Sequence, residues 1–244
     1  MAPARLHRVE DSGGEGLRKY GRPEQLQREV EAMTFVRENT SIPVPTVHEI
    51  HAPKGAKGNE CWILLQRVPG IALDKAWVQM DKDAQEGVTT QLRRHLDELH
   101  ALQPPQHGTI SSCSGGQVYD HRLGAHMCCG PFNSVREFHD FLIEPVAKHA
   151  HAKIVAKYRV VLPDDCAVQY THADLSWEHI MVDPSTNTIT GILDWEMAGF
   201  WPEWWEYSKA LSGWRHQVWW ENVVRQVTQA FPDVMHADRD IEMF

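Results

Sequence analysis

Two short apolar runs that each lead into an aspartate constrain this chain more than any other feature. Residues 167–171 lead toward Asp174, and residues 188–193 lead directly into Asp194. A third apolar run, residues 180–182, lies between them and is followed by a turn rich in Asp, Pro, Ser and Asn. We predict three strands that present two carboxylates, which can serve a hydroxyl nucleophile and a divalent cation.

The composition narrows the class of protein. A chain of 244 residues can bury a sizeable core, and its 42% hydrophobic and 23% charged residues are typical of globular proteins. The net charge of −9 argues against nucleic-acid partners and against anionic membranes, since both need basic surface. Residues 1–10 contain no apolar core of signal-peptide length, and we expect a cytoplasmic location. Five cysteines form no paired framework, which favours reduced thiols.

The first seventy residues read as a small α+β unit. Residues 17–20 are a short strand candidate that contains Lys19, and apolar residues at helical spacing predict a helix over 23–38. A strand over 61–68 then ends at a Pro-Gly pair. We therefore predict a first domain over residues 1–70.

The rest of the chain, residues 71–244, reads as mostly helical around the two-carboxylate hairpin. A leucine ladder predicts a helix over 81–102, a capping box opens another over 134–149, and helices close the chain from 203. Most of the ten tryptophans lie in the second half. They predict an aromatic core, with an aromatic pocket for a flat or cationic ligand as the alternative.

Three runs around the aspartates resemble the motifs of a known family: His172-Ala173-Asp174-Leu175, His179-Ile180-Met181-Val182 and Ile192-Leu193-Asp194-Trp195-Glu196. They are similar to the Brenner-type motif and the metal-binding motif of the aminoglycoside phosphotransferase family, and most of all to its short fungal members. The likeness runs from residue 17 to the end of the chain and includes Arg18-Lys19-Tyr20-Gly21.

This resemblance implies an α+β, protein-kinase-like two-lobe fold, with a reduced N-terminal lobe over 1–70 and a mostly helical C-terminal lobe over 71–244. It also implies an ATP-dependent O-phosphotransferase that acts on a small hydroxylated metabolite and uses ATP and Mg²⁺. Asp174 would be the catalytic base, His172 would support the catalytic loop, and Asp194 would hold the metal.

The same resemblance assigns the nucleotide-binding residues. Lys19 would contact the α and β phosphates and would pair with Glu29 on the following helix, with Glu31 as the second choice. Gln66 to Pro69, including Gln66 and Val68, would form the hinge that contacts adenine through backbone groups.

Position 179 departs from the family pattern, because His179 stands where the family has a metal-binding Asn. Mg²⁺ prefers oxygen ligands, whereas imidazole suits zinc, manganese or iron. We therefore expect weaker Mg²⁺ binding or a different metal such as Mn²⁺. Alternatively, His179 acts as a general acid or base, or it only fills the site of the Asn.

The glycine-rich segment 12–16 lies too close to Lys19 for a full phosphate-covering hairpin, and we interpret it as a linker. A second group of candidate residues, His121, His126, Cys128 and Cys129, is interpreted as lining for a small-molecule pocket in preference to a metal site.

Two other functions remain open at this point. One is a repurposed enzyme of secondary metabolism, a cyclase or isomerase that uses no ATP or metal. Its acid–base residues would come from His172, Asp174, His179 and Asp194. The other is a pseudokinase-like binding module without turnover.

Overall fold

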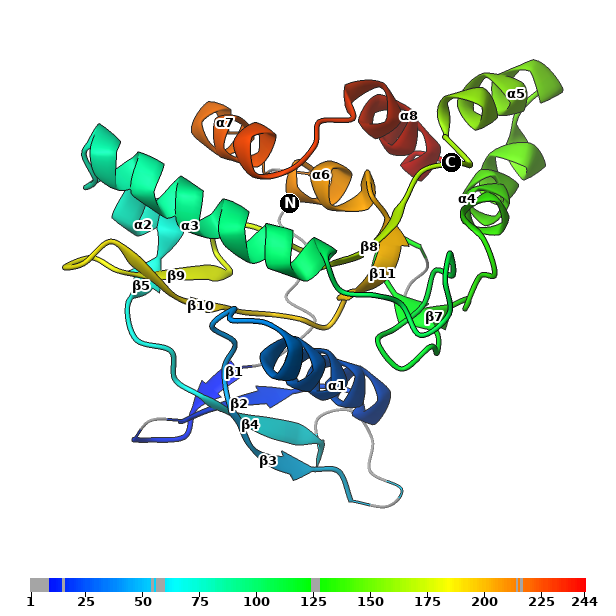
Figure 1. Ribbon diagram of the computed structural model, residues 1–244. Coiled ribbons are helices and arrows are strands. Elements are labelled where there is room, and N and C mark those ends of the chain that lie inside the picture. Colours follow the sequence, from blue (N-terminus) through cyan, green and yellow to red (C-terminus); the bar gives the residue numbers. More distant parts are fainter. Residues whose placement is uncertain are drawn as a thin grey trace.

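The computed structural model describes residues 9–14, 16–53, 55, 60–123, 128–213, 215 and 217–244. Figure 1 shows an N-terminal sheet with one helix at one end of the molecule and a larger helical part at the other. In the part of the chain that the structure describes, no helix is long and apolar enough to cross a membrane.

The N-terminal part is an antiparallel sheet in the order β1-β2-β4-β3. Its strands are β1 (Val9–Asp11), β2 (Gly16–Tyr20), β3 (Val47–His51) and β4 (Trp62–Gln66). Helix α1 (Pro23–Asn39) begins with proline, whose fixed φ suits a first helical turn. Its apolar face buries Leu26, Met33 and Val36, which join the main hydrophobic core. The predicted helix over 23–38 and the strand at Lys19 are therefore present.

The glycine-rich segment before Lys19 is part of a hairpin, and the linker interpretation is wrong. Strand β1 pairs with β2, with Val9 opposite Lys19. Gly13 and Gly14 both adopt positive φ, where glycine is favoured, and Asp11 accepts a hydrogen bond from the Gly13 N–H. The strand that carries Lys19 is itself the return strand, which is why eighteen preceding residues suffice.

The chain leaves the first sheet after Gln66 and enters β5 (Ile71–Ala72), which pairs with β9 in the other part of the molecule. Gly70 makes this crossing possible, because its φ is +106° and a Cβ there would clash with the Val182 carbonyl oxygen. The Pro69 carbonyl accepts a hydrogen bond from the Thr190 hydroxyl. The domain boundary at residue 70 stays a prediction.

The larger part holds most of the helices. They are α2 (Leu73–Trp77), α3 (Lys82–His100), α4 (Val135–His149), α5 (Ala152–Val161), α6 (Trp205–Ala210), α7 (Val218–Val227) and α8 (Pro232–Glu242). The predicted leucine ladder is the buried face of α3, where Leu92, Leu96 and Leu99 are at most 1% exposed. Helix α5 was not predicted from the sequence, and it buries none of its residues fully.

Three small antiparallel sheets position the functional loops. Strands β9 (Ile180–Asp183) and β10 (Thr188–Ile192) form the predicted hairpin beside β5, and β8 (Val168–Thr171) pairs with β11 (Gly199–Pro202). A third pair, β6 (Val118–Tyr119) and β7 (Cys128–Cys129), was not predicted from the sequence.

Tryptophan side chains fill the core of this part, as predicted. Trp195, Trp201, Trp204, Trp205 and Trp220 are fully buried. The rings of Trp201 and Trp205 stack with their centroids 4.7 Å apart. This packing fixes α6 and β11 behind the loop that carries Asp174. All five cysteines are free thiols, in agreement with the prediction.

Candidate functional site

The loop after β8 is held by the ring of His172, which bonds the backbone on both sides. Its Nε2–H donates to the Leu193 carbonyl at 2.8 Å, and its Nδ1 accepts from the Asp174 N–H at 3.2 Å. Burial, helped by the nearby His179, lowers the pKa of His172 to about 4. His172 is therefore neutral near neutral pH, and it ties the Asp174 loop to the residue before Asp194.

Glu206 on α6 also holds this loop through hydrogen bonds. Its carboxylate accepts hydrogen bonds from the N–H groups of His172, at 2.6 Å, and Ala173, at 3.2 Å. These bonds stabilise a turn in which Ala173 adopts φ +59°. Burial raises the pKa of Glu206 to about 7. No role was predicted for Glu206, which lies in an aromatic segment of the sequence.

Asp174 projects from this loop with its carboxylate 10% exposed. Burial would raise its pKa, but the charges of His179 and Arg215 outweigh burial and hold the pKa of Asp174 below its usual value. Arg215 Nη1 donates to Asp174 Oδ1 at 2.8 Å. Arg215 lies between α6 and α7, and no sequence pattern pointed to it.

Asp194 follows β10 in a backbone conformation with φ +67°. Its Oδ1 accepts a 2.7 Å hydrogen bond from the Lys19 ammonium, which bridges the two parts of the molecule. Burial opposes the charge of Asp194, but Lys19 and His179 outweigh it and hold the pKa of Asp194 well below its usual value.

Lys19 lies among three carboxylates. Glu29 Oε2 is 2.7 Å and Glu196 Oε2 is 3.5 Å from the ammonium that also contacts Asp194. Burial works against the charge of Lys19, yet these carboxylates raise its pKa well above the usual value. Burial also raises the pKa of Glu29 to about 7, since a single ammonium does not compensate the whole cluster. The pair predicted between Lys19 and Glu29 is thus present.

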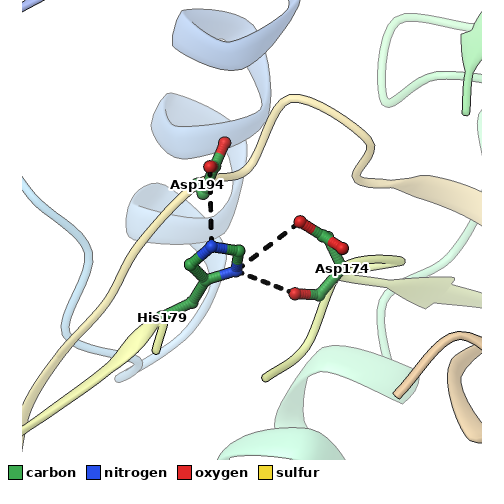
Figure 2. Close-up of side chains that lie close together, drawn as sticks. All are labelled: Asp174, His179 and Asp194. Carbon is green, nitrogen blue, oxygen red and sulfur yellow. Dashed lines mark hydrogen bonds and ion pairs between the residues drawn. The ribbon is translucent and has the colours of Figure 1, made fainter. Parts of the chain in front are cut away.

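His179 lies between the two aspartates, and Figure 2 shows its ring with one nitrogen toward each. Nδ1 is 2.9 Å from the Asp174 backbone carbonyl and 3.6 Å from Asp174 Oδ2. Nε2 faces Asp194 Oδ2 at 3.6 Å. A ring whose Nδ1–H is engaged by a backbone carbonyl presents Nε2 as the metal-binding nitrogen, which is the usual arrangement of histidine ligands.

The donor set fits a divalent cation. Asp174, His179 and Asp194 offer ligand atoms within 4.8 Å of one another, and so do Glu29, Asp194 and Glu196. Carboxylates outnumber the ammonium group at this place, so a cation would relieve repulsion between them. An imidazole beside carboxylates suits Mn²⁺ or Zn²⁺ better than Mg²⁺.

Other predicted site residues lie elsewhere. Glu31 accepts hydrogen bonds from Gln27 and Ser114, whereas Lys19 pairs with Glu29. The Gln66 side chain accepts hydrogen bonds from the backbone and hydroxyl of Thr46. Val68 packs on Gly191, where an added Cβ would lie 2.6 Å from Val68 Cγ1.

The His and Cys group of the β6–β7 segment is only partly described. Cys128 Sγ accepts a hydrogen bond from Arg28 on α1, and His126 lies outside the described residues. Burial and the charge of Lys209 lower the pKa of His121, and the charges of Asp120 and Asp174 act in the opposite direction.

The comparisons with known proteins agree on one family. Residues 9–239 match the family described as "Phosphotransferase enzyme family". Aminoglycoside 3'-phosphotransferase of Streptomyces fradiae is 26% identical over 155 residues, which are 63% of this chain and 52% of that protein. The enzyme of the same description from Streptomyces ribosidificus is 27% identical over 156 residues. The chain thus matches about half the length of these curated relatives.

Solved structures confirm the predicted fold class. The GDP and kanamycin complex of APH(2")-IIia has a TM-score of 0.62 at 14% identity, over 99% of this chain and 80% of that one. Aminoglycoside phosphotransferase APH(3'')-Id from Streptomyces rimosus, in complex with ADP and streptomycin, has a TM-score of 0.59 at 14% identity, over 99% and 94%. With this kinase-like two-lobe fold and the match over residues 9–239, the chain belongs to the phosphotransferase enzyme family.

Proposed function

We propose that this protein is an ATP-dependent O-phosphotransferase that acts on a small hydroxylated metabolite. The observation that carries the proposal is the arrangement of Asp174, His179 and Asp194, with Lys19 bonded to Asp194 at 2.7 Å. Phosphoryl transfer needs a base for the acceptor hydroxyl, a cation and an ammonium for the phosphates, all positioned before the reaction. The relatives that bind GDP or ADP support a nucleotide as the donor.

Asp174 is the base in this proposal. It accepts the proton of the acceptor hydroxyl while that oxygen forms a bond to the γ-phosphorus of ATP. The bond from the γ-phosphorus to the bridging oxygen breaks, and ADP leaves with the electron pair. The lowered pKa of Asp174 keeps the carboxylate ionised at neutral pH, so it is ready to accept a proton.

Lys19 and the crossing segment bind the nucleotide. Lys19 stays protonated, because its pKa is raised by its carboxylate partners, and it contacts the α and β phosphates. Glu29 orients Lys19 through the 2.7 Å ion pair. Gln66 and Val68 belong to the segment between the two parts of the molecule, whose backbone groups contact adenine.

Asp194 and His179 hold the cation. When bound, a divalent cation neutralises charge on the phosphates. Asp194 supplies a carboxylate oxygen and His179 supplies Nε2, while the Asp174 carbonyl holds the His179 ring in place. We propose Mn²⁺ or Mg²⁺ as the cation, with Mn²⁺ favoured by the nitrogen ligand.

The test is acceptor-dependent transfer of the labelled γ-phosphoryl group from ATP to a panel of hydroxylated small molecules. Asp174→Asn is expected to lower kcat by about 10²- to 10⁴-fold, the usual contribution of a general base. Asp165→Asn, at an exposed aspartate, is the matched control and should keep full activity. Equal transfer by wild type and Asp174→Asn would remove Asp174 from this role.

A further inference from the structure

Arg215 contacts the carboxylate of the proposed base, Asp174. Its guanidinium contacts Asp174 Oδ1 at 2.8 Å, whereas the other oxygen, Oδ2, faces His179. Figure 2 shows the ring of His179 between Asp174 and Asp194, and Asp194 is the residue proposed to hold the cation. Arg215 therefore bonds the oxygen of Asp174 that does not face His179, and an acceptor hydroxyl that bonds this oxygen has to displace Arg215 from it.

The Arg215 side chain is nearly buried and incompletely bonded. It is 12% exposed, and its Nε is a buried donor without a hydrogen-bond partner among the described residues. The Arg215 N–H donates to the Ser212 carbonyl, and the Arg215 carbonyl accepts from the Gln217 N–H. A guanidinium has five N–H donors in a planar fork, and Asp174 uses one of them here.

A guanidinium in this position needs an anion when the acceptor binds. A hydroxyl that bonds Asp174 competes with Arg215 for the carboxylate, and a buried cation without a partner is strongly unfavourable. Three positive charges act on the Asp174 carboxylate, those of His179, Arg215 and Lys209, and the negative charge of Asp194 opposes them. Lys209 is itself neutralised by Asp120 at 2.8 Å and does not need a second anion.

From this arrangement we propose that Arg215 is a specificity-determining residue that binds an anionic group, a carboxylate or a phosphate, on the acceptor. The inference rests on the proposed phosphotransferase function and names the class of its substrate. When the acceptor binds, the Arg215 guanidinium releases Asp174 and bonds the anionic group of the acceptor. The Asp174 carboxylate is then free to bond the acceptor hydroxyl. The planar fork suits a carboxylate or phosphate, which it can bind through two parallel hydrogen bonds. Cationic acceptors are disfavoured despite the net charge of −9.

The experiment uses acceptors that differ only in charge. Gluconate, glucitol and glucamine form one matched set, and 3-(hydroxymethyl)benzoate with the corresponding alcohol and amine forms another. ADP release is measured with ATP and Mn²⁺ for wild type, Arg215→Gln and Arg215→Lys. We expect that the acceptor which is phosphorylated is an anion. Arg215→Gln should raise the KM for this acceptor about 10- to 100-fold with a smaller change in kcat, and Arg215→Lys should restore the KM in part. Arg225→Gln, at an exposed arginine paired with Glu221, is the control.

Two results would overturn the proposal. One is a neutral or cationic acceptor whose KM is unchanged in Arg215→Gln. The other is a weaker affinity of Arg215→Gln for a non-hydrolysable ATP analogue with Mn²⁺, without acceptor, because Arg215 would then serve the nucleotide.

A second measurement tests the anion site of Arg215 if the enzyme phosphorylates none of the acceptors in the panel. Asp174→Asn leaves the Arg215 charge uncompensated, so millimolar inorganic phosphate should raise the melting temperature of this variant. The double variant Asp174→Asn/Arg215→Gln should lose that increase. A phosphate effect without any ADP release would support the anion site and count against the phosphotransferase function, while equal responses of both variants would contradict the anion site.

Discussion

At the scale of single residues, His179 is the feature that distinguishes this site. The sequence shows that His stands where the resemblance expects Asn, but it does not show which ring nitrogen is available. The structure answers this through long-range contacts: the Asp174 carbonyl engages Nδ1, and Nε2 faces Asp194. The ring is therefore oriented as a ligand.

The first prediction concerns His179→Asn. Replacing the imidazole nitrogen with an amide oxygen should favour the harder cation, because Mg²⁺ prefers oxygen ligands. We expect the ratio of Mg²⁺ to Mn²⁺ affinity, measured by cation titration with ATP present, to rise about 10-fold. A ratio that does not change would mean that His179 is not a ligand.

The residues of the site were predicted unevenly. Lys19, Glu29, Asp174 and Asp194 could be predicted because each belongs to a motif or to a helix that follows one. Arg215 could not, because a single charged residue in an aromatic segment has no distinctive spacing. Glu206 lies in residues 202–207, which are similar to the family, but this similarity indicated no role for it. Their importance depends on which loop they contact, and that is decided by tertiary packing.

At the scale of elements, the β1–β2 hairpin shows where local patterns are insufficient. Val9–Asp11 is only three residues long, and the segment that follows is rich in glycine, so neither suggests a strand. Pairing with β2 stabilises it. Helix α3, in contrast, was predicted because four of its apolar residues recur on one face that the core then buries.

The second prediction tests the crossing between the two parts with a pair of glycines. Gly70→Ala should destabilise the protein by about 2 kcal/mol or more, since φ is +106° and the new Cβ would meet the Val182 carbonyl oxygen. Gly87→Ala is the control, because nothing lies within 4 Å of its Cβ and it is exposed on α3. The control should stabilise by about 0.5–1 kcal/mol. Urea denaturation of both variants gives these differences, and similar effects of the two would contradict the role of Gly70.

At the scale of the whole molecule, the site depends on groups from both parts. Lys19 and Glu29 come from the sheet and helix of the N-terminal part, and they meet Asp194 of the larger part. The family motifs could predict this meeting, because they imply two lobes. They could not predict the buried network in which Asp120 pairs with Arg122 and with Lys209 of α6. Asp120 and Arg122 come from a segment without periodicity, and Arg122 packs over the Trp205 ring.

The third prediction concerns stability in acid. Burial lowers the pKa of His100, at the end of α3, to about 4 in the folded protein, against 6.5 when unfolded. Between these values the unfolded chain binds more protons, so the stability falls as the pH falls from 6.5 to 4. His100→Gln should remove about 1–3 kcal/mol of this loss. The lowered pKa of His172 has the same effect on the stability of the wild type and of His100→Gln, so it cancels in the difference between them. Parallel curves of unfolding free energy against pH would contradict the prediction.

The measurement that tests the central claim most directly is the melting temperature of wild type and Asp194→Asn at millimolar ATP, with Mn²⁺, with Mg²⁺ and with neither. We predict that ATP stabilises the wild type only when a cation is present, and more with Mn²⁺, because Asp194 and His179 hold the cation beside Lys19. Asp194→Asn should lose this cation-dependent stabilisation. If ATP with either cation does not stabilise the wild type, or stabilises Asp194→Asn equally, the protein does not bind nucleotide through this site and the phosphotransferase proposal fails.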